Sequence, residues 1–371
     1  FVAEACFSTL RRLRSLSARC PDDQPRKLLL ASMFCLRGWN LKQMAPVLND
    51  TDAEWLSAAK AMPVDSWPLA VRLDLPDWLF ERLSAKYPLD IEALATALNR
   101  PAPLDLRINP MKVTREAVLQ RLAADGMPGT ACVHSPLGIR LEEKPALSRH
   151  PLFLDGSIEV QDEGSQLLGY LVAPKRGEMV VDFCAGAGGK TLLLGALMRS
   201  AGRLYAFDVS EKRLASLKPR LARSGLSNVH PVRIESENDI KVKRLAGKLD
   251  RVLVDAPCSG LGTLRRNPDL KWRQSPESVT ELTQKQHDIL TAAARLVKSG
   301  GRLVYATCSL LAEENEDVVS AFLAAHPDFV PLNAAEILSR QGINVGDEAA
   351  LRLLPHVHGS DGFFAMAMER K

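Results

Sequence analysis

Two cysteines stand at the ends of short apolar runs, where a nucleophile can reach a ligand. Cys258 follows the run 251–257, and Cys308 closes the run 302–308. Both runs are rich in valine and leucine, which is typical of buried parallel strands. If the strands are neighbours, they lie about 4.8 Å apart and both thiols face the crevice at their carboxyl ends. The pair therefore indicates nucleophilic chemistry, against the alternative of two inert, buried cysteines.

A glycine-rich turn, DFCAGAGGKT at 182–191, follows another apolar run. Glycine lets backbone N–H groups approach a ligand closely. Asp208 ends the next run, 20 residues beyond Gly188, and a carboxylate there can accept hydrogen bonds from both hydroxyls of a ribose. The turn therefore favours an adenosyl cofactor without phosphates, which means S-adenosylmethionine.

Three other interpretations of this turn stay open. GGKT followed by VLVD at 252–255 imitates a P-loop, but the first glycine of that motif would fall at Cys184. A dinucleotide site is the second alternative, although the glycine spacing is not G-x-G-x-x-G. The third is a structural turn without a ligand.

A thiolate and a sulfonium methyl donor together point to methylation of cytosine. Carbon 5 of cytosine is too weak a nucleophile to take a methyl group directly. A thiolate that adds at carbon 6 makes carbon 5 electron-rich, and proton loss and elimination of the enzyme follow methyl transfer. The sulfonium and Lys190 could raise the ionised fraction of the thiol. Asp255 could stabilise the protonated ring at nitrogen 3, unless it is a capping or turn-forming aspartate.

The elements that must position these residues form three parts. Residues 1–90 show apolar positions at helical spacing and no recognisable chemistry. Residues 91–170 predict a small α+β unit, with a strand at 105–110 and a helix at 114–126. Residues 171–371 alternate apolar runs with helical segments, which predicts a Rossmann-like, doubly wound parallel sheet of the α/β class.

Composition limits the class of protein. Of the 371 residues, 46% are apolar and 25% are charged, which excludes a mainly disordered or fibrous chain. The net charge of +4 permits nucleic acid as a partner. The seven cysteines are scattered without C-x-x-C, which argues against a disulfide framework or a zinc site. We expect a cytoplasmic monomer with no metal and no membrane segment.

Several motifs, in order along 103–371, resemble the RsmB/NOP2/Sun family of RNA cytosine-5 methyltransferases, closest to the bacterial ribosomal RNA type. Several motifs in the right order are more specific than any one alone. They are RIN (107–109), EVQDEGSQL (159–167), DFCAGAGGKT (182–191), DAPCSGLGTLRRNPDLKW (255–272), ATCSL (306–310) and DGFF (361–364).

The resemblance implies S-adenosylmethionine as cofactor and RNA as substrate, with ribosomal RNA favoured over tRNA. It implies that Cys308 is the nucleophile, that Cys258 assists release of the methylated RNA, and that Asp255 contacts the base. The cofactor-binding residues that it implies are Cys184, Ala185, Gly186, Ala187, Gly188, Gly189, Lys190, Asp208 and Asp255.

A basic segment, 241–273, surrounds the DAPC motif with nine Lys or Arg against three Asp, a local excess of +6. Arg265, Arg266 and Lys271 could neutralise phosphates, and Trp272 could stack on a base. A solvated basic loop is the alternative.

The resemblance extends to the parts that precede the Rossmann-like domain. Residues 91–170 resemble the family's small RNA-binding extension, so Arg107 is assigned an RNA contact. Residues 1–90 take the place of a helical, NusB-like domain that docks RNA or a partner.

Two positions depart from the family pattern. Ser236 stands where the family carries an aspartate near the adenine, and Glu235 or Glu237 could substitute with a shifted backbone. Ala187 stands where the family prefers proline. The missing aspartate motivates a rival hypothesis, a non-catalytic RNA-binding assembly factor, although both cysteines are retained.

Overall fold

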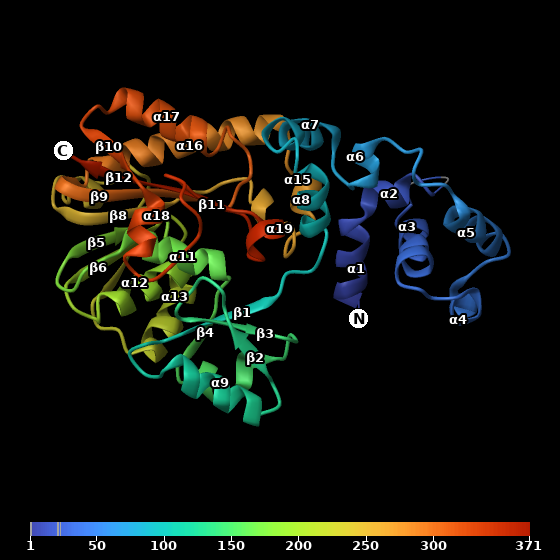
Figure 1. Ribbon diagram of the computed structural model, residues 1–371, viewed down its shortest axis with the longest axis horizontal. Helices are drawn as coiled ribbons and strands as arrows, with labels where there is room; N and C mark the ends of the chain where they lie inside the picture. The colour runs from blue at the N-terminus through green and yellow to red at the C-terminus, as the bar shows by residue number, and fades with distance from the viewer. Residues whose placement is uncertain (1, 21, 23) are drawn as a thin grey trace. The chain divides into compact units, whose positions relative to one another are not determined.

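The computed structural model describes residues 2–20, 22 and 24–371 and divides into two compact units (Figure 1). The first unit contains the chain up to Pro101 together with Thr263–Pro276, and the second contains Ala102–Gly262 and Glu277–Lys371. The helical part therefore ends later than the expected residue 90. The expected α+β and α/β parts share the second unit.

The first unit is built from short helices around a small aliphatic core. Its helices are α1 (Val2–Arg11), α2 (Leu13–Ser17), α3 (Pro25–Ala31), η1 (Ser32–Leu36), α4 (Leu41–Met44), η2 (Ala45–Val47), α5 (Asp52–Ala61), α6 (Leu69–Arg72), α7 (Asp77–Lys86), α8 (Ile91–Leu98) and α15 (Leu270–Arg273).

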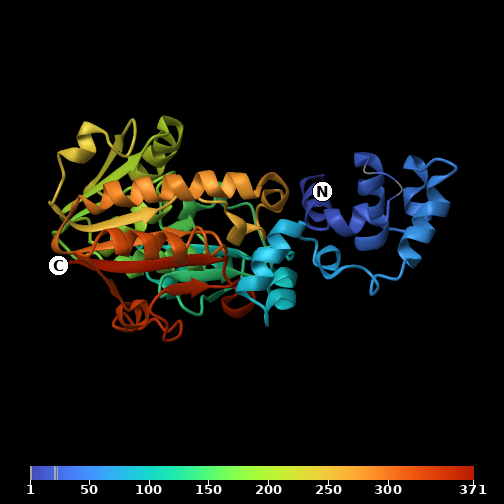
Figure 2. The ribbon, with the colours of Figure 1, turned by 90° about the horizontal axis from the view of Figure 1, so that it is seen from above.

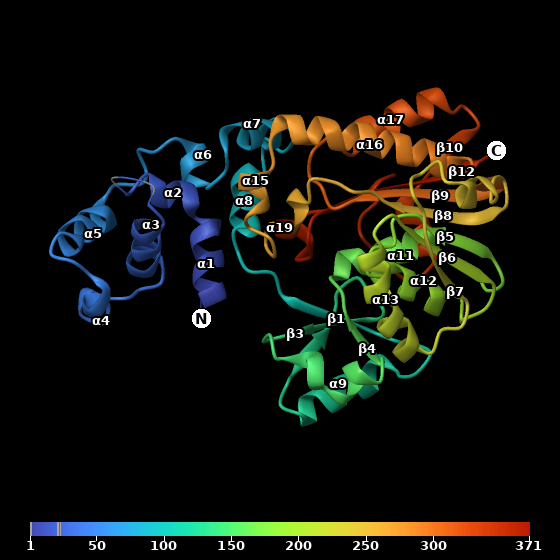
Figure 3. The same cartoon turned by 180° about the vertical axis from the view of Figure 1, so that it is seen from behind.

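A four-stranded antiparallel sheet begins the second unit, in the order β2-β3-β1-β4. Thr114 caps helix α9 by accepting a hydrogen bond from the backbone N–H of Ala117, as the sequence predicted. Helix α9 lies beside the small sheet (Figure 3). Its Val118 and Leu122 belong to the same buried apolar cluster as the strand residues. The elements are β1 (Leu104–Ile108), α9 (Arg115–Ala124), β2 (Gly129–Ala131), β3 (Gly138–Leu141), η3 (Leu147–Arg149), α10 (Pro151–Leu154) and β4 (Ile158–Val160).

The large sheet has the order β10-β12-β9-β8-β5-β6-β7, and β11 pairs with β12. Strands β9, β8, β5, β6 and β7 are parallel, whereas β12 is antiparallel to its neighbours. The Rossmann-like fold predicted from the sequence is confirmed. The strands are β5 (Met179–Asp182), β6 (Arg203–Asp208), β7 (Val229–Arg233), β8 (Leu249–Asp255), β9 (Val297–Thr307), β10 (Phe329–Leu332), β11 (Leu351–Leu353) and β12 (Phe363–Arg370).

Helices cover both faces of this sheet. Successive residues of a strand point to opposite faces, so the strands place apolar side chains on both. Val180 packs in one apolar cluster and Val181 in the other. Figure 2 shows α16, in orange, running along the sheet. Helices α11 (Glu163–Val172), α12 (Gly189–Leu197), α13 (Glu211–Ser224) and α18 (Ala334–Ser339) lie on the first face, and α14 (Ile240–Lys243), α16 (Pro276–Ala294) and α17 (Glu316–Ala325) lie on the second. The one-turn helices η4 (Leu261–Thr263) and α19 (Pro355–His358) complete the unit. Among the described residues, no helix has the length and apolar character that crossing a membrane requires.

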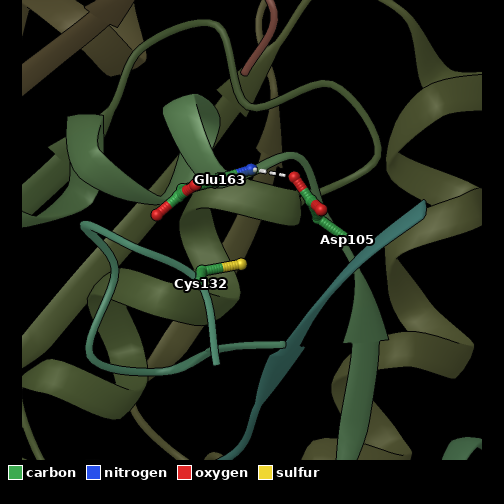
Figure 4. Close-up of side chains that lie close together, drawn as sticks. All are labelled: Asp105, Cys132 and Glu163. Atoms are coloured by element: carbon green, nitrogen blue, oxygen red, sulfur yellow. Dashed lines mark hydrogen bonds between the residues drawn. The ribbon is translucent and has the colours of Figure 1, made fainter. Parts of the chain in front are cut away.

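An ion-pair group joins the small sheet to α11. Figure 4 shows Asp105, Cys132 and Glu163, with the hydrogen bond from the Glu163 backbone N–H to Asp105. Arg140 forms ion pairs with both carboxylates of this group. Its guanidinium lies 2.7 Å from Asp105 and 3.6 Å from Glu163. Burial, followed by the two carboxylates, raises the pKa of the Cys132 thiol. The ion pairs with Arg140 and the hydrogen bond from Glu163 explain the two carboxylates as a structural junction.

Candidate active site

A cavity of about 730 Å³ lies at the carboxyl ends of β5, β6, β8 and β9. Each of these strands leads into one of the motifs singled out in the sequence. Because the carboxyl ends of parallel strands meet at one edge of a sheet, segments far apart in the chain share this cavity. The predicted residues that line it are Cys184, Ala185, Gly186, Ala187, Gly189, Lys190, Asp208, Asp255, Cys258 and Cys308.

Two glycines of the glycine-rich turn have backbone angles that residues with a side chain rarely adopt. Gly186 and Gly188 have φ of 56° and 84°, in the left-handed region that favours glycine. A Cβ atom at Gly188 would lie 2.1 Å from Leu217 of α13. Glycine is therefore required at 188 for packing, which lets helix α12 begin directly behind the turn.

Asp208 holds this turn from the end of β6. Its carboxylate accepts hydrogen bonds from the backbone N–H groups of Gly186, at 2.8 Å, and Ser210, at 2.7 Å. Each carboxylate oxygen still has a lone pair, so Asp208 can also accept a hydrogen bond from a hydroxyl in the cavity.

Arg107 contacts the turn from the small sheet, although the sequence assigned it to RNA. It is only 4% exposed, and its guanidinium donates to the carbonyl of Gly189 at 2.8 Å and to the side chain of Gln161. Burial lowers its pKa to about 10. The RNA contact expected for Arg107 disagrees with this placement, because its guanidinium is buried and bonded to the glycine-rich turn.

Arg220 of α13 supports the same turn and was missed by the sequence analysis. It donates to the carbonyl of Ala187 at 2.6 Å and pairs with Glu159 of β4 at 2.9 Å. Glu159 also pairs with Arg223 at 2.6 Å. The motif that begins at Glu159 was recognised, but only the fold shows that its first residue bonds to α13.

Lys190 and Asp255 form an ion pair of 2.7 Å in the cavity wall. Burial acts to lower the pKa of Lys190, but the charge of Asp255, its hydrogen bond and the Cys308 sulfur raise it overall. Lys190 therefore stays protonated and supplies a positive charge near the proposed nucleophile.

The two thiols meet at the cavity. The Sγ atoms of Cys258 and Cys308 lie 3.4 Å apart, and both side chains are half-buried. The strands β8 and β9 are paired neighbours, with Asp255 opposite Ala306. The hydrogen bond with Cys308, followed by burial, raises the pKa of the Cys258 thiol. A protonated Cys258 can thus donate to a thiolate at Cys308.

Gly362 of the DGFF motif, directly before β12, contacts the loop that follows Cys258. The backbone N–H of Gly262 donates to the carbonyl of Cys308, and that of Gly362 donates to the carbonyl of Gly262, both at 2.8 Å. A Cβ atom at Gly262 would lie 2.2 Å from the Gly362 carbonyl. These contacts require glycine at Gly262 because the loops after β8 and β9 approach one another so closely.

Comparison with known proteins identifies the family. The model of the 16S rRNA methyltransferase RsmB/F family matches residues 169–369, and that of an RsmF/B-like ferredoxin-like domain matches residues 75–148. The chain belongs to the RsmB/F family of rRNA methyltransferases.

Relatives named for the same activity agree along most of the chain. Identity is 39% to the probable ribosomal RNA small subunit methyltransferase B of Synechocystis, covering 81% of this chain and 68% of the relative. It is 33% to the protein of the same name in Bacillus subtilis, covering 88% and 73%. A methyltransferase homolog from Pyrococcus horikoshii, 29% identical, superposes with a TM-score of 0.71 over 84% of this chain and all of that chain.

The cofactor of this RsmB/F protein is S-adenosylmethionine, and the cavity fits it chemically. Asp208 offers acceptors for ribose hydroxyls, and the turn presents open space at Gly186, where an added Cβ would meet no atom within 4 Å. Glu235, Ser236 and Glu237 line the same cavity. Asp182, at the end of β5, is not among the described residues that line the cavity. Burial raises its pKa to about 7, and it accepts a hydrogen bond from Thr191.

The four RNA-binding candidates of the basic segment lie in the helical unit. Lys271 is 1% exposed, and its ammonium donates to the Arg11 carbonyl and to Asn99, both at 2.8 Å. Trp272 donates its indole N–H to the carbonyl of Leu10. Arg265 is buried, and Arg266 is half-buried. The RNA contact predicted for Lys271 is therefore contradicted, because its ammonium is buried inside the helical unit and donates its hydrogen bonds there.

Proposed function

We propose that this protein methylates carbon 5 of a cytosine in small-subunit ribosomal RNA through a covalent bond between Cys308 and the ring. The observation that carries the proposal is the pair of thiols 3.4 Å apart in the wall of the cavity. The relatives named ribosomal RNA small subunit methyltransferase B support this choice of RNA. Ribosomal RNA as substrate also supports a cytoplasmic location.

The charges around the thiols support Cys308 as the nucleophile. The ammonium of Lys190 interacts electrostatically with the Cys308 sulfur, whereas the hydrogen bond with Cys308 and burial raise the pKa of Cys258. The S–H of Cys258 can then stabilise the thiolate before attack. The two cysteines therefore differ in their charged neighbours, which supports different roles in the reaction.

The proposed reaction needs four changes at the ring. The Cys308 sulfur bonds to carbon 6 while the carboxyl group of Asp255 stabilises the protonated nitrogen 3. Bound S-adenosylmethionine supplies an activated methyl group, which carbon 5 accepts. Carbon 5 then gives its proton to a base such as water, the bond between carbon 6 and sulfur breaks as the double bond returns, and nitrogen 3 releases the proton that it gained. Cys258, beside the leaving sulfur, assists this release.

Removal of each thiol separately tests the proposed roles. Cys308→Ala should abolish methyl transfer, because no covalent bond to carbon 6 can form. Cys258→Ala should accumulate a covalent protein–RNA adduct, visible as a slower band on a denaturing gel. Cys6→Ala, at an exposed cysteine, is the matched control and should behave as wild type. Absence of the adduct would contradict the division of roles.

The alternative RNA substrate is tRNA. Bisulfite sequencing of total RNA from a strain that lacks the protein should show one unprotected cytosine in small-subunit ribosomal RNA. Loss of protection in tRNA instead would transfer the same chemistry to that substrate. Unchanged RNA, with no cofactor binding by calorimetry, would favour a non-catalytic assembly factor.

A further inference from the structure

A buried carboxylate lies behind the two cysteines, and the proposed chemistry has not used it. Glu314 precedes helix α17 and is fully buried. It is not one of the described residues that line the cavity. A buried carboxylate is costly unless its oxygens accept hydrogen bonds, so the groups that bond to it are informative.

The carboxylate of Glu314 contacts the residue after each cysteine. One oxygen accepts from the backbone N–H of Ser259 at 2.8 Å. The other accepts from the hydroxyl of Ser259 at 2.5 Å and from the hydroxyl of Ser309. One side chain therefore bonds to both loops, whose cysteines are 50 residues apart in sequence.

Gln286 of α16 completes the arrangement. Its amide donates to the first oxygen of Glu314 at 3.0 Å and to the carbonyl of Pro257, directly before Cys258, also at 3.0 Å. Each carboxylate oxygen thus accepts two hydrogen bonds, all from neutral groups. All four of these groups are donors, so Glu314 acts as an acceptor toward each of them.

We propose that Glu314 is the positioning residue that sets the distance between the Cys258 and Cys308 sulfur atoms. Pairing of β8 and β9 ends at Asp255 and Ala306. Beyond it, the Gly262–Cys308 backbone hydrogen bond and the contacts of Glu314 join the two loops. The serine after each cysteine is bonded to the same carboxylate, so movement of either thiol away from the other breaks a charge-assisted hydrogen bond. The kinetic consequence rests on the proposed function, whereas the geometric consequence does not.

The geometric test measures the distance between the thiols directly. Dibromobimane links two thiols only when they are close, since each sulfur displaces one bromide from the same small molecule. The full-length wild type should give a bridged Cys258–Cys308 peptide by mass spectrometry. Glu314→Gln should reduce bridging toward the level of a Cys258→Ala control, because the new amide places a donor where two donors already point.

The kinetic test separates positioning from a merely structural role. Glu314→Gln should lower kcat for methyl transfer about 100-fold, the scale expected for misplaced reacting groups, while the Kd for S-adenosylmethionine stays unchanged. Glu336→Gln makes the same chemical change at an exposed carboxylate of α18 and should leave bridging and kcat as in the wild type.

The serine variants provide a graded series if the Glu314 variants do not fold. Ser309→Ala removes the contact of the Cys308 loop with the carboxylate, whereas Ser259→Ala leaves the backbone N–H bond of Ser259 in place. We expect a larger loss of bridging and kcat for Ser309→Ala. Wild-type bridging in a folded Glu314 variant, or in Ser309→Ala, would overturn the proposal. Bridging that depends on Glu314 in a protein without methyl transfer would instead refute the proposed function alone.

Discussion

At the scale of residues, the two thiols of the site have different charged neighbours. Cys308 lies in the electrostatic range of the Lys190 ammonium, whereas Cys258 is opposed by burial, by the neighbouring sulfur and by the charge of Glu314. The two sulfur atoms therefore differ in their charged neighbours, with a cation acting on Cys308 and an anion acting on Cys258.

The adenine side of the cavity leads to a prediction at a single residue. Ser236 stands among Glu235 and Glu237 in the cavity wall, where the resembled family carries aspartate. Ser236→Asp should lower the Kd for S-adenosylmethionine about tenfold, as a hydrogen bond to a charged group would do. Isothermal calorimetry measures this. An unchanged Kd, together with weaker binding in Glu237→Gln, would show that Glu237 already performs this role.

At the scale of elements, the small sheet holds the cofactor turn as well as covering it. Arg107 of β1 bonds to the Gly189 carbonyl, and Glu159 of β4 holds Arg220 against the Ala187 carbonyl. Two strands of the small sheet therefore reach the same turn through guanidinium groups, whose planar donors suit fixed carbonyl geometry.

Replacement of Arg107 distinguishes this positioning role from an RNA contact. Arg107→Lys should raise the Kd for S-adenosylmethionine about tenfold, because a buried carbonyl loses a well-aligned donor. The salt dependence of RNA binding should not change, whereas loss of one phosphate contact would lower its slope by about one. Arg121→Lys, at an exposed arginine of α9, is the control. Calorimetry and binding titrations at several salt concentrations measure both quantities.

At the scale of the whole molecule, the segment Thr263–Pro276 belongs to the helical unit although it follows the Cys258 loop in sequence. Lys271 and Trp272 of α15 bond to carbonyls at the end of α1. The helical unit is therefore completed by a part of the chain far from its own helices, and its stability depends on this segment.

Burial of Lys271 predicts that stability depends on pH. Burial lowers its pKa to about 7, below the usual 10.4 of the unfolded chain. Between these values the unfolded state binds the extra proton, so the free energy of unfolding should rise with pH by up to about 1.4 kcal/mol per unit. Calorimetric scans from pH 7 to 10 should show a rising Tm for the helical unit. Lys271→Met should flatten this rise, while Lys175→Met, at an exposed lysine, should preserve it. A Tm independent of pH in the wild type would contradict the assignment.

The sequence by itself determined the elements and most of the cavity wall. Periodicity acts locally, so the helix expected within 114–126 and the parallel strands followed from the residues alone. The motifs identified the cavity residues because strand ends in a doubly wound sheet converge whatever the details of packing.

Only the tertiary structure decided which charged side chains face the cavity or solvent and which are buried. The sequence analysis expected RNA contacts for Arg107 and Lys271. Inside the protein, both side chains instead donate hydrogen bonds to carbonyls distant along the chain. Glu314 carries no local signal, since its partners Ser259 and Ser309 come together only when β8 and β9 pair. Burial and hydrogen bonding depend on contacts between distant segments, and no local pattern encodes those contacts.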